Sequence, residues 1–267
     1  MADFSAQDVK RLRDATGAGM MDAKRALEAT VGHFENAVAW LRERGLGKAA
    51  ERSGRESTDG AVAVALVGDS ASIVQLRSET DFVAKSPQFV QLVEDLARAV
   101  ASDGEGAIDG YKDALDDLRL TLKENIQVGT VVRFAAEPGH VLDSYVHIQN
   151  GRGVNAVLVE LEGGTAELAH DVAVHIAFGR PGALRREDVP AEEVDAERAT
   201  LEAQTRNEGK PEGAIAKVVE GKLNGWFKRV PGGVLLEQPY AKDDKLSTTQ
   251  FLGGVGVVRF AQAVIGS

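Results

Sequence analysis

Few residues of this 267-residue sequence have the types and spacing that covalent chemistry requires. The chain contains no cysteine, which excludes thiolate nucleophiles, disulfide bonds, thiolate zinc sites and iron–sulfur clusters. Its five histidines form no HExxH pattern, and His170 and His175 lie five residues apart, whereas paired zinc ligands on a helix lie four apart. We therefore expect no metal site.

Motifs that bind phosphate or activate a nucleophile are also missing. The sequence has no GxxxxGKS/T loop and no GxSxG elbow. Residues 151–156 match a loose GxGxxA pattern, but they lead into a strand-like run at 157–159 rather than into the helix of a dinucleotide site. We expect no cofactor and no enzyme activity, and an unrecognised hydrolase is the weakest interpretation.

The residues that most suggest a function are Thr80, Asp81, Phe82 and Val83, at a corner between a predicted strand and a predicted helix. One interpretation is structural: Phe82 fills the core and Asp81 caps a turn. The other is that both are presented to a partner, as an aromatic anchor beside a charge. By themselves the residues favour the first interpretation.

The elements that position this corner follow from hydrophobic periodicity. Apolar runs at 61–67 and 72–77 predict two strands joined by a turn at 68–70. After the corner, Ser86 and Pro87 are suited to the N-cap and first residue of a helix, and apolar residues then recur at helical spacing. The corner is therefore expected between a strand and a capped helix.

The body of the chain predicts two α+β halves with antiparallel sheets, a core subdomain at 56–139 and another at 140–267. Four further segments read as strands: 126–134, 141–147, 154–161 and 255–264. Helical runs follow at 111–122 and 165–178. A polar helical stretch, a Gly/Pro break and a second helix predict an antiparallel helical hairpin at about 188–229.

The N-terminal segment predicts three short helices around a very small core. Ser5 and Asp8 have the spacing of a capping box, and a glycine-rich turn at 16–19 ends the first helix. Met20 and Met21 are adjacent, so both cannot face one core; one is exposed as an adaptable partner surface, or Met20 is core and Met21 lies at its rim. The stretch 42–57 reads as a linker.

The charge is distributed unevenly along the chain. Residues 1–55 carry ten Lys and Arg and eight Asp and Glu, so this head is +2, and the remaining residues are −12 within a total of −10. The acidic pI of about 5.1 argues against direct nucleic-acid binding, because binding to phosphates requires clustered Lys and Arg. No apolar run is long enough to span a membrane, and no signal peptide is visible, so we expect a cytoplasmic protein.

Two long segments carry a family resemblance. They read LRDATGAGMMDAKRAL at 12–27 and ETDFVAK at 79–85, in the order and separation of the translation elongation factor Ts family. Shorter matches follow at 124–126, 145–147, 208–212, 219–223 and 238–240, with His170 and His175 between them. The resemblance covers essentially the whole chain.

This resemblance implies a guanine-nucleotide exchange factor that binds elongation factor Tu and promotes GDP release so that GTP can rebind. It implies a ubiquitin-associated-like head at 1–55, a two-subdomain core and a coiled-coil hairpin insertion. Asp81 and Phe82 would form a wedge near the partner's magnesium and phosphate site. The other implied partner contacts are Leu12, Met20, Met21, Thr80, Val83, Ile126, His147 and His170. The alternative is a divergent module that binds elongation factor Tu with little exchange.

Overall fold

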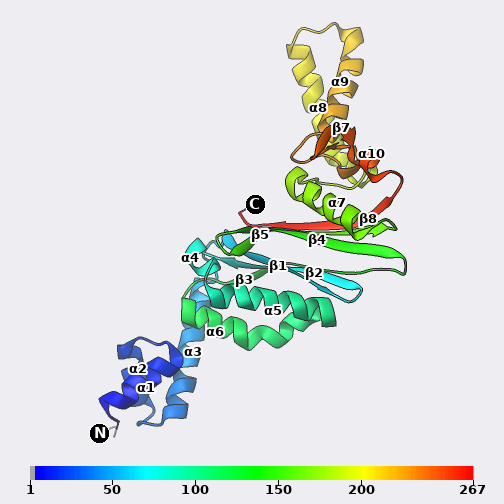
Figure 1. Ribbon diagram of the computed structural model, residues 1–267. Coiled ribbons are helices and arrows are strands. Elements are labelled where there is room, and N and C mark those ends of the chain that lie inside the picture. Colours follow the sequence, from blue (N-terminus) through cyan, green and yellow to red (C-terminus); the bar gives the residue numbers. More distant parts are fainter. Residues whose placement is uncertain (1–3, 267) are drawn as a thin grey trace.

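The computed structural model describes residues 4–266, and Figure 1 shows an elongated molecule with a helical head at one end and a helical arm at the other. Between them, two three-stranded antiparallel sheets pack face to face, with helices on their outer sides. The predicted α+β class with antiparallel sheets is confirmed.

The head consists of α1 (Ala6–Thr16), α2 (Met20–Ala29) and the first part of α3 (Phe34–Arg52). The predicted capping box is present: Ser5 Oγ accepts the N–H of Asp8, and the Asp8 carboxylate accepts the N–H of Ser5. The buried hydrophobic side chains of the head form one small cluster: Val9, Leu12, Ala23, Ala26, Leu27 and Ala37. Such a core gives the head little stability of its own.

The predicted linker at 42–57 is wrong over its first part, because α3 continues as a helix to Arg52. The extension lies against α6 (Lys112–Leu122). A Cβ at Gly45 would lie only 2.3 Å from Leu120 Cδ2, so the glycine permits this close approach. A helix that packs through glycine shows no apolar stripe in the sequence, which explains the error.

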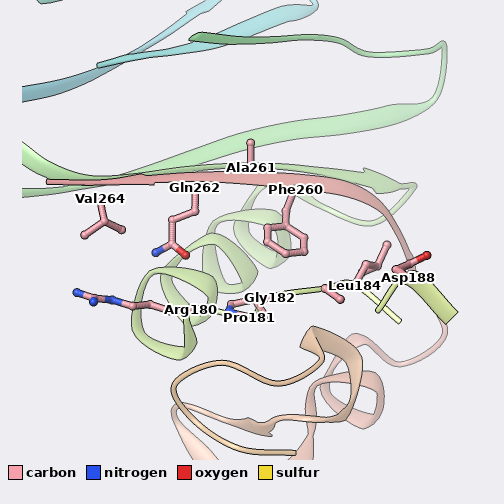
Figure 2. A pocket seen from close by; sticks show the side chains of 10 residues that line it. Arg180, Pro181, Gly182, Leu184, Asp188, Phe260, Ala261, Gln262 and Val264 are labelled. Atoms are coloured by element: carbon pink, nitrogen blue, oxygen red, sulfur yellow. The ribbon is translucent and has the colours of Figure 1, made fainter. Parts of the chain in front are cut away.

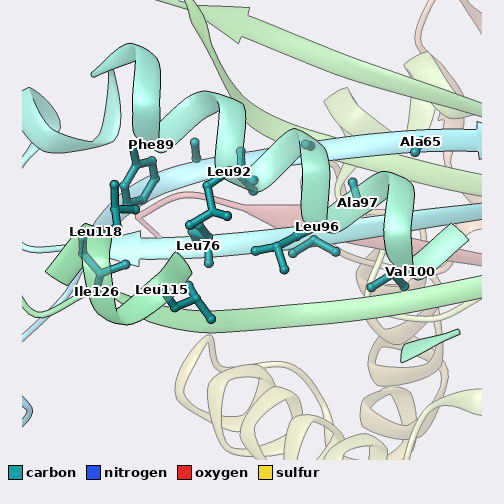
Figure 3. Close-up of a cluster of buried hydrophobic side chains, with 14 of the residues drawn as sticks. Ala65, Leu76, Phe89, Leu92, Leu96, Ala97, Val100, Leu115, Leu118 and Ile126 are labelled. Carbon is teal, nitrogen blue, oxygen red and sulfur yellow. The ribbon is translucent and has the colours of Figure 1, made fainter. Parts of the chain in front are cut away.

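The first sheet has the order β1-β2-β3. Its strands are β1 (Asp59–Val67), β2 (Ser70–Ser78) and β3 (Gln127–Ala135). Helix α5 (Pro87–Asp103) covers its outer face, and the 3-10 helix Glu105–Tyr111 leads into α6. Figure 3 shows α5 side chains, among them Phe89, Leu96 and Val100, in one buried cluster with Leu76 of β2. This core supports the corner that follows β2.

The second sheet has the order β4-β5-β8, with α7 (Ala166–Gly179) on its outer face. Its strands are β4 (His140–Gln149), β5 (Arg152–Glu162) and β8 (Gly256–Val264). The inner faces of the two sheets share a cluster of buried side chains that includes Val62, Ile73 and Leu158. The two halves of the body are therefore joined through a common core.

The predicted helical hairpin is confirmed as the arm, formed by α8 (Ala191–Asn207) and α9 (Glu212–Phe227). Its base is closed by short elements: Arg186–Asp188, Leu235–Glu237, β6 (Pro239–Tyr240), β7 (Asp243–Ser247) and α10 (Thr248–Leu252). Within residues 4–266, no helix combines the length and apolar character needed to cross a membrane.

Candidate partner-binding site

The corner after β2 is a single helical turn, α4 (Asp81–Ala84). Thr80 is its N-cap, with extended backbone and a side-chain oxygen that accepts the N–H of Val83 at 3.4 Å. At the other end, Ser86 Oγ donates to the carbonyl of Val83 at 2.8 Å. Ala84 is buried against the core. The backbone of the turn is thus held at both ends, which sets the directions in which its Cα–Cβ bonds point.

Phe82 is presented to solvent, with 74% of its surface exposed. The structural interpretation of this residue is therefore wrong: Phe89 of α5 fills the core, and Thr80, not Asp81, caps the turn. The Asp81 side chain is also about half exposed. An exposed phenyl ring beside an exposed carboxylate on a fixed turn is the geometry of a contact anchor.

Lys85 binds both members of this pair. Its Nζ lies 3.1 Å from Asp81 Oδ2 and 4.3 Å from the centroid of the Phe82 ring. This role of Lys85 was not predicted from the sequence, although the i, i+4 spacing of Asp81 and Lys85 indicates it. All three groups lie on the surface, so a partner can displace the ammonium at small energetic cost.

The head presents a second apolar surface. Met20 and Met21, in the first turn of α2, are 46% and 62% exposed, so the interpretation that places Met20 in the core is wrong. Leu12 is a fully buried member of the head core. Leu12 therefore offers no surface to a partner in this structure.

Ile126 is also fully buried, in the core under the first sheet, and offers no surface to a partner. His147 and His170 are both exposed. His170 of α7 lies 3.7 Å from the Asp143 carboxylate and makes an edge contact with Tyr145. Because alternate residues of a strand share a face, His147 lies on the same side of β4 as Asp143 and Tyr145. The structure thus brings the two predicted histidines to one side of the second sheet.

His175 is structural rather than ligating. It is buried, its Nδ1 accepts the N–H of Ala241 at 3.2 Å, and its Nε2 lies 3.1 Å from Thr248 Oγ1. Burial lowers the pKa of its imidazole, so the ring stays neutral. Among the described residues, no group of three His, Asp or Glu side chains is arranged to hold a metal ion.

A depression of about 640 Å³ lies between the loop after α7 and strand β8 (Figure 2). Arg180 and Asp188 are its only charged side chains, and the remaining lining is apolar or amide. It contains no nucleophile beside a base and none of the predicted site residues. The exposed side chains on the fixed turn and on the head have the arrangement of a protein-binding factor.

Comparison with known proteins identifies the family to which this chain belongs. The elongation factor Ts family model matches residues 79–267. Over its full length the chain is 40% identical to elongation factor Ts of Clavibacter michiganensis subsp. michiganensis and 41% identical to that of Streptomyces coelicolor, each covered completely. It is 42% identical to that of Kineococcus radiotolerans over 96% of each chain. The chain belongs to the elongation factor Ts family. It is a guanine-nucleotide exchange factor of translation elongation, and its partner is elongation factor Tu.

Proposed function

We propose that Asp81 and Phe82 form the wedge through which this chain releases GDP from elongation factor Tu. The observation that supports this is the 74% exposure of Phe82 on a turn that is fixed at both ends. Thr80 and Val83 shape the turn and border the contact. Full burial of a phenyl ring contributes about 1.5–3 kcal/mol, which corresponds to about 10- to 150-fold in affinity.

The wedge acts on the electrostatics of the nucleotide site. A carboxylate and a phenyl ring placed near a bound magnesium ion can displace the elements that hold the ion. Loss of the metal contact leaves phosphate charge uncompensated, so GDP is held more weakly. The coupling is reciprocal: the factor weakens GDP binding by the same ratio as GDP weakens binding of the factor, and about 3 kcal/mol gives about 150-fold.

Two further surfaces hold the partner while the wedge acts. Met20 and Met21 of the head contact the same domain as the wedge. Both are exposed, and their flexible thioether side chains can adapt to an apolar surface. His147 and His170 contact another domain of the partner. Leu12 and Ile126 contribute indirectly, by supporting the head surface and the wedge corner from their cores.

Each proposed domain carries one of these partner-binding surfaces. The head at 1–55 grips, the core subdomain at 56–139 carries the wedge, and the subdomain at 140–267, with its arm at about 188–229, carries the histidine surface. Contacts spread over separate surfaces of one molecule add avidity to a wedge that is itself small.

The test is the release of fluorescent GDP from elongation factor Tu, followed by stopped flow. The native chain accelerates release, and the double variant Asp81→Ala, Phe82→Ala removes most of the acceleration. Leu66→Ala is the matched control, because Leu66 is 50% exposed and lies at the opposite end of β1 and β2 from the wedge. An unchanged rate in the double variant would refute the wedge. If the native chain binds elongation factor Tu without accelerating GDP release, the alternative of a divergent binding module holds.

A further inference from the structure

At the base of the wedge, the carboxylates of Glu79 and Glu124 accept hydrogen bonds from backbone N–H groups of each other's segment. Glu124, just before β3, accepts the N–H of Glu79 at 3.0 Å and the N–H of Thr80 at 3.1 Å through Oε2, and the Thr80 hydroxyl through Oε1. In return, Glu79 Oε1 accepts the N–H of Asn125 at 2.7 Å. This reciprocal bonding fixes the N-cap of α4 on the segment that precedes β3.

The same cluster holds a third segment, the end of the head's long helix. Asn125 is 5% exposed, and its Nδ2 donates to the carbonyls of Ser53 at 3.1 Å and Arg55 at 2.6 Å, just after α3. Ser57 Oγ donates to the Asn125 carbonyl at 2.8 Å. A buried amide with this many partners is a strong constraint, because no water replaces a lost bond.

Two further contacts bind α3 to α6: Gly45 lies close against Leu120, and Arg52 Nη2 donates to the Arg119 carbonyl at 3.4 Å. Arg42 pairs with Asp113 at 2.7 Å, but both side chains are exposed, and exposed ion pairs contribute little. Figure 1 shows α3 running without interruption from the head to the body beside α6. The packing of α3 on α6 and the hydrogen bonds of Asn125 just after α3 together set the direction in which the head projects.

We propose that Glu124 and Asn125 are positioning residues, a clamp that fixes the wedge and the head relative to each other. Glu124 sets the position of the wedge, and Asn125 anchors the segment after α3, which with the packing on α6 sets the orientation of the head. A two-point contact gains from a rigid link, because one bound surface then holds the other at high effective concentration. The proposal rests on the wedge and head contacts proposed above.

The two halves of the clamp predict opposite kinetic effects on GDP release. Asn125→Ala loosens the anchor after α3 and widens the range of head orientations, so the half-saturating concentration rises, by about fivefold, while the plateau rate stays within about twofold. Glu124→Ala loosens the wedge, so the plateau rate falls with a smaller change in half-saturation. Glu124→Gln restores the plateau, because its amide oxygen can accept both N–H groups and its nitrogen can donate to Thr80 Oγ1. Glu192→Ala, on the exposed face of the arm, is the control.

A second readout needs no partner. Because the chain has no cysteine, spin labels can be placed at Ala29→Cys in the head and Ser102→Cys on α5, both exposed positions, and their distance distribution measured in the free protein. Asn125→Ala broadens this distribution, whereas a control pair within the body, at Ser102→Cys and Thr121→Cys, is unchanged. Gln127→Ala removes a 3.2 Å bond to the Ser53 carbonyl at an exposed position and gives a smaller broadening if Asn125→Ala does not fold.

The outcomes separate the clamp from the wedge. Broadening of the head–body distance together with the kinetic split supports the clamp. A narrow distance distribution in both Asn125→Ala and Gln127→Ala overturns the clamp. It is also overturned if the plateau rate and the half-saturating concentration worsen equally and in step with a lower melting temperature. If the wedge double variant exchanges normally while the distance still broadens, the wedge assignment fails and the clamp's effect on head orientation stands.

Discussion

The wedge corner and the methionine surface of the head both present large apolar side chains to solvent, but they are supported in opposite ways. Phe82 has a rigid ring on a turn that is fixed by Thr80, Ser86 and the carboxylates beneath it. Met20 and Met21 have flexible side chains on a three-helix head with a small core. A rigid anchor suits a site that must be disturbed in one particular way, and an adaptable surface suits a site that must only be held.

The largest expected effect comes from the small core of the head. Leu12→Ala removes a fully buried side chain, a change that costs about 2.7–5 kcal/mol in well-packed cores and exceeds what the head can lose. We expect the head to unfold while the sheets stay intact. Hydrogen exchange would show loss of protection confined to α1, α2 and the start of α3. Lys10→Ala, an exposed change on α1, is the control.

That local collapse would mark the head as a separately folding unit. If Leu12→Ala instead lowered protection throughout the two sheets, the head and body would be one cooperative unit, and the contrast between an adaptable and a rigid region would fail.

The second effect separates surface from core in the head. Met20→Asp places a charge at the proposed apolar contact, so we expect binding to elongation factor Tu to weaken by about 10-fold or more, since about 1.4 kcal/mol corresponds to tenfold. The melting temperature should hardly change, because Met20 is 46% exposed. Titration calorimetry and thermal melting check the two halves of this prediction.

Met20→Leu serves as the conservative comparison. It should bind almost normally, because an adaptable surface tolerates another apolar side chain. Lower melting with unchanged affinity in Met20→Asp would instead mean that Met20 stabilises the head and makes no contact with the partner.

How far the sequence predicts these regions depends on the range of the contacts involved. Strands, capped helices and the hairpin were predicted because their signals are local: alternation, caps and a Gly/Pro break. The extension of α3 was missed, since its packing on α6 uses the absence of a side chain at Gly45. Local pattern cannot show which of two apolar residues faces a core, so the residues alone favoured burial of Phe82, and the family resemblance pointed to its exposure.

The clamp illustrates contacts that a single sequence does not show. Glu79 and Asn125 are 46 residues apart, and Asn125 and Ser53 are 72 apart, yet they are direct partners. Glu124 and Asn125 were noticed only as part of a family motif. Likewise the burial of Leu12 and Ile126 depends on tertiary packing that periodicity does not specify.

The third expected effect concerns His175, a buried polar side chain, in contrast to the half-exposed polar groups of the wedge. Burial lowers the pKa of His175 below its usual 6.5, so the folded state keeps the ring neutral while the unfolded state takes up a proton below that pH. Stability is therefore full above about pH 6.5 and falls as the pH drops below it, by at most about 1.4 kcal/mol per pH unit.

Chemical denaturation between pH 7.5 and 5.5 measures this slope. His175→Gln should flatten it, whereas His33→Ala should not, because His33 is exposed. An identical slope in His175→Gln would assign the pH dependence to other groups and remove the contrast with the wedge.

The smallest expected effect concerns Lys85, and it tests whether the wedge is a unit of two residues or of three. Lys85→Met keeps the aliphatic stem and removes the ammonium that lies beside Asp81 and over the Phe82 ring. Freeing the carboxylate favours exchange, and losing the contact over the ring loosens Phe82; each is worth about 0.2–1 kcal/mol at an exposed site, with opposite signs. We therefore expect GDP release to change less than about fivefold and to depend less on salt. A loss of tenfold or more would mean that the ammonium itself contacts the partner, and the rigid anchor would then be a charged pair with a ring rather than a ring with one carboxylate.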